Sequence, residues 1–246
     1  MTSLTAQDLS LFKKEMFTEK GDTLPYRILL PKDFNPEKTY PFLLFLHGAG
    51  ERGKDNEAQL THGADLFLKE ENREKFPAII VFPQCAEDSY WSSVNVQRES
   101  GNYTWTYPDK KQKNPSLDLV EGLICQLKKT YKIDKKRLYT VGLSMGGMGT
   151  FEMVWRNPKM FAAAMPICGG ANPAIVGKLT RPEWWIFHGE EDAVVPVHLS
   201  KDMQKALLEV GATAKLTLYS EVNHDSWTNA FAEEYFLSWL FSKRRD

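Results

Sequence analysis

The sequence predicts an α/β fold in which helices cover both faces of a mostly parallel, twisted sheet. Continuous apolar runs of strand length recur at 40–46, 78–83 and 184–187, as expected for parallel strands that are buried on both faces. Helical patterns lie between such runs, and the clearest is the amphipathic stretch 117–131. The chain is long enough for one such unit, so residues 1–246 are expected to form a single domain.

The other expected elements complete this alternation. Two strands, 11–17 and 24–30, flank a turn at Gly21-Asp22 and predict an antiparallel hairpin at the N-terminal edge of the sheet. Ser116 is the expected N-cap of the helix at 117–131. The remaining predictions are helix 58–69, strand 137–141 with a helix directly after it, strand 162–168, helix 198–210, strand 215–219 and helix 227–242.

Residues 85–114 interrupt the alternation of strands and helices. This segment of about thirty residues shows no clear periodicity, and structureless connections of that length are usually functional. Because it follows the carboxyl end of a strand, we expect a loop over the rim of the active site that forms one wall of the substrate pocket. Trp91 is expected to contact the substrate, and packing of its ring onto the body of the domain is the alternative.

The most informative stretch is V-G-L-S-M-G-G at 141–147. It follows an apolar strand, precedes an apolar helical run, and matches G-x-S-x-G, the strained strand-to-helix turn known as the nucleophile elbow. Gly142 and Gly146 stand where side chains would collide in so tight a turn. The pattern therefore predicts Ser144 as a nucleophile, and the flanking elements disfavour a glycine-rich turn that holds a serine by chance.

The apolar strand 40–46 ends in H-G-A-G at 47–50, a loop of the H-G-x-G type that supplies an oxyanion donor. Backbone N–H groups aimed at a developing oxyanion stabilise it by roughly 3 kcal/mol each. We assign the two donors to Ala49 and Met145, and a glycine next to Ala49 is the alternative for the first. His47 is expected to brace the loop and not to act as a base.

A cluster of acidic residues follows strand 184–187, in the run H-G-E-E-D-A-V-V-P that begins at His188. A carboxylate just past the end of a strand lies on the rim where open α/β sheets place their chemistry. In the H-G-x-x-D-x-x-V-P arrangement the acid is the fourth residue after the histidine, which selects Asp192 over Glu190 and Glu191. The two glutamates are expected to be solvated, and His188 is expected to pack in the loop.

The base is expected on the loop after strand 215–219, where His224 lies just before the terminal helix. A loop histidine is usually a surface residue, but His224 completes a set of serine, aspartate and histidine. The chain order Ser144, Asp192, His224 is that of α/β-hydrolases, whereas other serine-hydrolase folds run their triads in different orders. We therefore predict a catalytic triad of these three residues.

With these motifs the chain resembles the group of α/β-hydrolases that includes polyhydroxybutyrate-depolymerase-like, phospholipase/carboxylesterase-like and feruloyl-esterase-like proteins. The matching segments lie at 46–53, 131–134, 142–147, 166–170 and 188–196, and the resemblance extends from about residue 26 to the C-terminus. It implies the α/β-hydrolase fold and a serine carboxylic-ester hydrolase that acts through an acyl-enzyme. Such a mechanism requires no metal and no organic cofactor.

Within this group the expected substrates are short-chain, aryl or carbohydrate-linked esters, as in feruloyl or acetyl esterases. A serine peptidase of the prolyl-oligopeptidase-like group and a non-catalytic hydrolase-fold binding protein are the alternatives. The 246 residues show no propeller or other gating domain, which disfavours the peptidase. The intact set of Ser144, Asp192 and His224 disfavours the binding protein.

Arg52 follows the oxyanion loop by two residues and has two candidate roles. It can reach a carboxylate or phosphate of the substrate, or it can pair with Glu51 or another loop acid and stiffen the turn. The structural role is favoured.

Composition narrows the partners and the compartment. A formal net charge of −1 gives no electrostatic reason to expect nucleic acid or an anionic membrane surface, and no apolar run reaches the ~18–20 residues of a membrane span. Residues 1–10 lack the regions of a signal peptide and favour a cytoplasmic protein, although a chain whose signal had been removed, periplasmic or secreted, would look the same. Cys85, Cys125 and Cys168 cannot form a disulfide framework and lack metal-site spacing.

Overall fold

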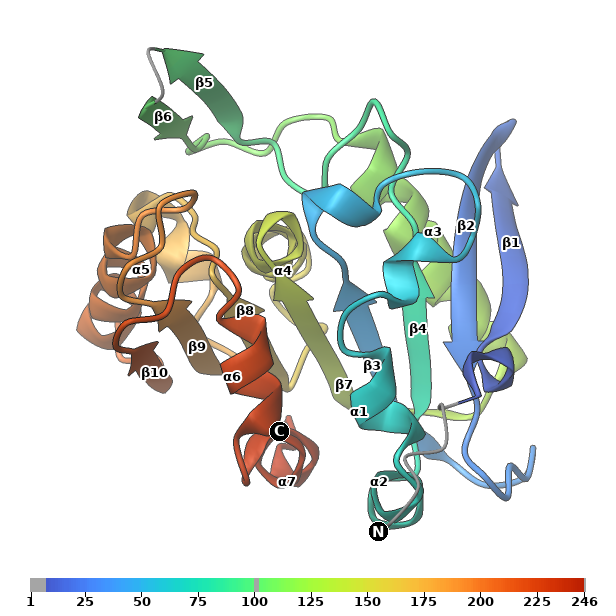
Figure 1. Ribbon diagram of the computed structural model, residues 1–246. Helices are drawn as coiled ribbons and strands as arrows, with labels where there is room; N and C mark the ends of the chain where they lie inside the picture. The colour runs from blue at the N-terminus through green and yellow to red at the C-terminus, as the bar shows by residue number, and fades with distance from the viewer. Residues whose placement is uncertain (1–7, 100–101, 246) are drawn as a thin grey trace, which may run out of the picture.

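The computed structural model describes residues 8–99 and 102–245 and shows the predicted α/β architecture (Figure 1). The strands of its main sheet are β1 (Lys13–Glu19), β2 (Asp22–Leu29), β3 (Tyr40–Leu46), β4 (Ile79–Pro83), β7 (Ile133–Leu143), β8 (Ala163–Ile167), β9 (Glu183–Gly189) and β10 (Ala214–Tyr219). Within the described residues they form an eight-stranded sheet in the order β1-β2-β4-β3-β7-β8-β9-β10. Neighbours from β4 to β10 pair in parallel, and β1 and β2 make the antiparallel N-terminal edge.

Helices cover both faces of this sheet. The helices are α1 (Ala64–Leu68), α2 (Glu70–Lys75), α3 (Pro115–Thr130), α4 (Met145–Arg156), α5 (His198–Glu209), α6 (Trp227–Ala232) and α7 (Phe236–Ser242). Because side chains alternate along a strand, Phe42, Leu44 and Leu46 of β3 pack with α3, α4 and α5, whereas Leu43 and Phe45 pack with α1, α6 and α7. The predicted fold class is therefore confirmed.

Three of the predicted helices differ in their ends or continuity from the helices of the structure. The N-cap of α3 is Asn114 and not Ser116, because the Asn114 side chain accepts the Leu117 N–H at 3.1 Å and Pro115 occupies the first helical position. The expected helix at 58–69 is broken at Gly63, which has a φ of +85° and lies between the 3-10 turn η3 (Ala58–Leu60) and the start of α1. The expected terminal helix is divided into α6 and α7 where the chain leaves helical geometry at Glu233.

The segment 85–114 is more ordered than the sequence predicts. It contains a two-stranded antiparallel ribbon of β5 (Asn95–Glu99) and β6 (Asn102–Thr106), and positions 100–101 lie outside the described residues. Figure 1 shows this ribbon at the upper left, away from the main sheet. The Ser93 N–H and hydroxyl donate to the buried Glu152 carboxylate of α4, at 2.6 and 2.7 Å. These bonds fasten the segment to the helix that follows β7.

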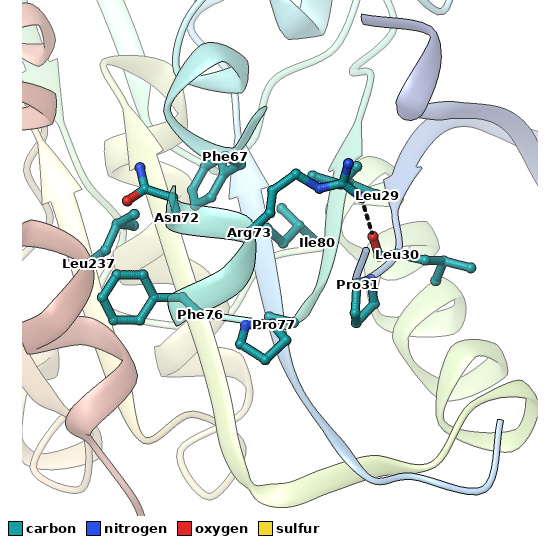
Figure 2. Close-up of a pocket in the computed structure, with 11 residues that line it drawn as sticks. Leu29, Leu30, Pro31, Phe67, Asn72, Arg73, Phe76, Pro77, Ile80 and Leu237 are labelled. Carbon is teal, nitrogen blue, oxygen red and sulfur yellow. Dashed lines mark hydrogen bonds between the residues drawn. The ribbon is translucent and has the colours of Figure 1, made fainter. Parts of the chain in front are cut away.

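A small pocket lies near the end of the sheet opposite to the carboxyl ends of the parallel strands. Figure 2 shows its lining, which includes Leu29, Phe67, Phe76 and Arg73, and Arg73 Nη2 donates to the Leu30 carbonyl at 3.2 Å. Its volume of about 10 Å³ has room for roughly one water molecule. The pocket is a packing feature, so the chemistry has to be sought at the other edge of the sheet.

Within residues 8–99 and 102–245, no helix is long and apolar enough to cross a membrane. The expectation about a signal peptide rests on residues 1–10, and residues 1–7 lie outside those that the structure describes.

Phe45 provides a test of the packing on the α1, α6 and α7 face. Its ring is fully buried and stacks on Phe82 with centroids 4.3 Å apart. Phe45→Ala should lower the free energy of unfolding by about 3–5 kcal/mol, measured by urea denaturation, because it leaves a cavity in a dense core. Leu208→Ala, at a site that is 49% exposed on α5, is the control and should change it by less than about 0.5 kcal/mol. Equal effects of the two substitutions would contradict this packing.

Candidate active site

Ser144 occupies the strained turn between β7 and α4 that the sequence predicts. Its φ and ψ of 52° and −116° are rare for a residue other than glycine, and such strain concentrates at functional sites. A Cβ on Gly146 would overlap the carbonyl oxygen of Leu46, and one on Gly142 would overlap that of Gly146. Only glycine allows the turn to press against the end of β3, and the Ser144 side chain therefore stands at the carboxyl edge of the sheet.

The structure brings the three predicted triad residues together. Ser144 Oγ lies 2.9 Å from His224 Nε2, and His224 Nδ1 lies 2.8 Å from Asp192 Oδ2. An ionised carboxylate only accepts hydrogen bonds, so the proton of the neutral ring is assigned to Nδ1, and Nε2 is left to accept the Ser144 hydroxyl. Both distances suit transfer of the serine proton to the histidine.

Asp192 is held in its charged form. Its Oδ1 accepts the N–H groups of Val194 at 2.9 Å and Val195 at 2.8 Å. Burial alone would raise the pKa of Asp192, but hydrogen bonds from His188 and His224 and the Val195 N–H hold it well below its usual range. A carboxylate in this state can stabilise a protonated His224.

The two neighbouring glutamates are exposed, as expected from the sequence. The Glu190 carboxylate accepts the Ser220 hydroxyl at 2.8 Å and lies 3.9 Å from Lys201 Nζ. Glu190 is therefore engaged with other groups, and the geometry selects Asp192 as the partner of His224.

A close backbone approach sets the position of the His224 loop. A Cβ on Gly189 would overlap the carbonyl oxygens of Val222 and Asn223, so the loop can cross the end of β9 only where glycine stands. Asn223 Oδ1 accepts the Ala193 N–H at 3.0 Å and the His224 N–H at 2.7 Å. Asn223 thus joins the loop of the acid to the loop of the base, a role that no motif in the sequence signals.

Aromatic contacts fix the ring of His224 from the side. Trp227 packs edge-on against it, with centroids 5.6 Å apart and an interplanar angle of 85°. The Trp227 ring is itself flanked by His62 at 5.0 Å, and His62 Nε2 lies 3.7 Å from a Glu51 carboxylate oxygen. This row of side chains links the base to the loop that follows β3.

The loop after β3 lies beside the Ser144 turn, because a Cβ on Gly146 would also come within 2.8 Å of the His47 carbonyl oxygen. Ala49 begins the 3-10 turn η2 (Ala49–Glu51), and Met145 begins α4. The first N–H groups of a helical turn have no partner inside it, so these two groups are suited to bind an oxyanion. The assignment of the oxyanion donors to Ala49 and Met145 stays a prediction.

His47 braces this loop, as expected. Its Nε2 accepts the Cys85 N–H at 2.9 Å, and its ring packs edge-on against Trp91 with centroids 5.3 Å apart. Burial lowers the pKa of His47 to about 4, against a smaller opposing effect of the hydrogen bond to the Gly48 carbonyl. The ring is therefore neutral near pH 7 and serves packing and hydrogen bonding.

Two expected substrate contacts have other roles in the structure. Trp91 is 0% exposed, and its Cβ lies where a side chain on Gly149 of α4 would stand. The prediction that Trp91 contacts the substrate is wrong, because the ring fills the core beneath the segment 85–114. Arg52 has the structural role that was favoured, although it binds carbonyls and not an acid: Nε donates to Ala49 at 2.9 Å and Nη1 to Ser89 at 3.2 Å.

Cys168, Asp192 and His224 place potential metal-binding atoms within 4.8 Å of one another. Burial raises the pKa of the Cys168 thiol, and the nearby charge of Asp192 raises it further, whereas a metal binds the thiolate. Asp192 Oδ2 and His224 Nδ1 are already hydrogen-bonded to each other. These donors therefore fit a catalytic pair with a neighbouring thiol better than they fit a resident metal.

Several proteins that this chain resembles in sequence or fold are esterases. Residues 18–230 match the family model described as "Putative esterase". The bifunctional acetylxylan esterase/xylanase XynS20E of Neocallimastix patriciarum is 29% identical over 178 residues, which make up 72% of this chain and 22% of that protein. A solved thermostable esterase is 36% identical, with a TM-score of 0.86 over 96% of this chain and 64% of its own.

A CE1 ferulic acid esterase of Anaeromyces mucronatus, solved with ferulic acid, is 15% identical and superposes with a TM-score of 0.68 over 92% of this chain and 89% of its own. At that identity the likeness concerns the fold alone. The chain spans only part of the acetylxylan esterase/xylanase and of the thermostable esterase, 22% and 64% of their lengths. The family match covers most of this chain, from β1 to α6, and the protein belongs to the esterase family and has the α/β-hydrolase fold.

Proposed function

We propose that this protein is a serine carboxylic-ester hydrolase that acts through an acyl-enzyme on short-chain, aryl or carbohydrate-linked esters. The observation that carries the proposal is the hydrogen-bonded chain from Ser144 through His224 to Asp192, with distances of 2.9 and 2.8 Å. The family match supports the ester bond as the target. The names of the relatives, an acetylxylan esterase and a ferulic acid esterase, support acetyl and feruloyl esters of carbohydrates.

The proposed mechanism uses each group in turn. His224 Nε2 removes the Ser144 proton as Oγ attacks the ester carbonyl carbon, and Asp192 stabilises the imidazolium that forms. The N–H groups of Ala49 and Met145 bind the tetrahedral oxyanion. His224 then protonates the leaving alcohol, and a water molecule activated by His224 hydrolyses the acyl-enzyme. No step requires a metal or an organic cofactor.

The segment 85–114 supplies a wall of the pocket in this proposal, through residues other than Trp91. Tyr90 Oη lies 3.8 Å from Met148 Sδ, and Met148 stands one helical turn after Ser144, since its N–H donates to the Ser144 carbonyl. The buried hydroxyl of Tyr107 has no hydrogen-bond partner among the described residues. The aromatic side chains of this segment favour a planar or sugar-linked ester.

The first test is a rate panel on the wild type and Ser144→Ala. It compares acetyl, butyryl and octanoyl nitrophenyl esters, methyl ferulate, acetylated xylan and a proline-containing peptide amide. We expect turnover of acetyl or feruloyl esters that falls by about 10⁴- to 10⁶-fold in the variant, because only binding and the oxyanion hole remain. Ser238→Ala, in an exposed position on α7, is the matched control and should keep the wild-type rate.

Ester hydrolysis that survives in Ser144→Ala would overturn the assignment of the nucleophile. Cleavage of the peptide amide at a rate above that of every ester would instead show a peptidase of the prolyl-oligopeptidase-like group.

The second test concerns the acid. Asp192→Asn should lower kcat by about 10⁴-fold, because an amide in place of the carboxylate favours the wrong tautomer of His224. Glu190→Gln and Glu191→Gln are the matched controls, and each should stay within a few-fold of the wild type, since both side chains are exposed. A near-normal rate in Asp192→Asn, with a large loss in one control, would move the acid to that glutamate.

A further inference from the structure

A second histidine donates to the carboxylate that orients His224. His188 lies near the end of β9, and the side chains of His188 and Asp192 are both 0% exposed. His188 Nε2 is 3.1 Å from Asp192 Oδ2 and 2.8 Å from the Val195 carbonyl oxygen. A carbonyl oxygen only accepts, so His188 Nε2 carries a proton and shares it between Val195 and Asp192.

The other nitrogen of the ring is anchored on α5. His188 Nδ1 lies 2.7 Å from Ser200 Oγ, and Ser200 Oγ lies 2.9 Å from the Gly169 carbonyl oxygen. The hydroxyl has one proton: if it bonds to Gly169, His188 is doubly protonated, and if it bonds to Nδ1, His188 is neutral. In both arrangements the Nε2–H faces Asp192.

Both histidines meet the same atom of Asp192. Oδ1 accepts the N–H groups of Val194 and Val195, and Oδ2 accepts His188 Nε2 and His224 Nδ1. Each donor draws on the negative charge that Oδ2 offers to the other. The bond from His188 therefore reduces the stabilisation that Asp192 gives to protonated His224.

We propose that His188 is a positioning residue of this active site: it fixes the orientation of Asp192 and, by donating to Oδ2, lowers the basicity of His224. The proposal rests on the proposed function of Ser144, Asp192 and His224. Its consequence is that His188 sets the lower pH limit of activity, because His224 must be unprotonated to take the serine proton.

Other titratable groups near the pair are few and differently placed. Cys168 at the end of β8 lies within 4.8 Å of Asp192 and His224, and its thiol stays protonated because burial raises its pKa. Asp225 is exposed. On the elements that hold His188, Glu190 and Lys201 form an exposed pair 3.9 Å apart, which solvent screens. The strand β10 beside His188 presents Leu218, which carries no charge.

The experiment follows the titration of His224 directly, by the pH dependence of its ring C–H signal in NMR spectra, assigned with His224→Gln. It uses wild type, His188→Leu, which removes the donor, and His188→Gln, which keeps an N–H near the position of Nε2. We expect the pKa of His224 to rise by about one unit in His188→Leu and by less in His188→Gln, because loss of the His188 donor leaves more negative charge on Asp192 Oδ2 to stabilise protonated His224.

Kinetics supply the second readout. The acid limb of the kcat/KM profile should move to higher pH by the same amount, with a fall in kcat of about tenfold and a nearly unchanged KM. His198→Gln, which removes an exposed histidine at the start of α5, is the matched control and should leave both the titration and the profile unchanged.

A His224 titration that is identical in wild type and His188→Leu would overturn the proposal, even where kcat falls, since a merely structural residue lowers the rate without moving the titration. Should His188→Leu fail to fold, His188→Phe decides, because it keeps an aromatic ring in the buried site and lacks the donor. A wild-type titration of His224 in His188→Phe, with the acid limb unmoved, overturns the proposal. If the wild type hydrolysed no ester, the proposed function would fail, and the NMR titration would still test the effect of His188 because it does not require turnover.

Discussion

The active site depends on one close backbone contact, that between the turn after β7 and the end of β3. Because glycine stands at 146, the turn can lie directly against the Leu46 and His47 carbonyls. This contact places the first turn of α4 against the end of β3, just before the loop that leads into η2, and Ala49 and Met145 are the first residues of their helical turns. It also forces Ser144 into its strained conformation, which turns the hydroxyl toward His224. The sheet provides the rigid frame that this strain requires.

Asp192 and His224, the proposed acid and base, lie on two loops that are joined to each other. Gly189 lets the His224 loop cross the end of β9, and Asn223 bonds to the backbone of both loops. Val194 and Val195 hold one oxygen of Asp192, which leaves the other for the histidines. A loop alone positions a side chain poorly. Here the loop of Asp192 and the loop of His224 are hydrogen-bonded to each other, so the geometry of the three side chains is set without a substrate.

Local patterns in the sequence predicted the features that local chemistry determines. Continuous apolar runs identified the parallel strands, because burial on both faces leaves no polar position, and the glycines of the elbow identified Ser144. Depth in the fold is not a local property, so an aromatic such as Trp91 looked the same whether it lined a pocket or filled the core. For the same reason the contacts of Asn223 became visible only when distant loops were placed together. His188 bonds to Asp192, four positions along the chain, but the sequence pattern does not tell which way either side chain points. The break at Gly63 and the cap at Asn114 are local features of the sequence. Proline favours the first position of a helix, so Pro115 indicates Asn114 as the N-cap.

Three histidines in loops or at strand ends illustrate how surroundings assign chemistry to one residue type. His47 is buried with both ring nitrogens bonded to the backbone, so it stays neutral and holds the oxyanion loop. His188 is buried with both nitrogens occupied as well, but one of them faces a carboxylate. Only His224 has a side chain that is partly exposed, at 20%, with a nitrogen directed at a hydroxyl. In the proposed mechanism, the residue that performs acid–base chemistry is therefore the one whose second nitrogen faces the Ser144 hydroxyl.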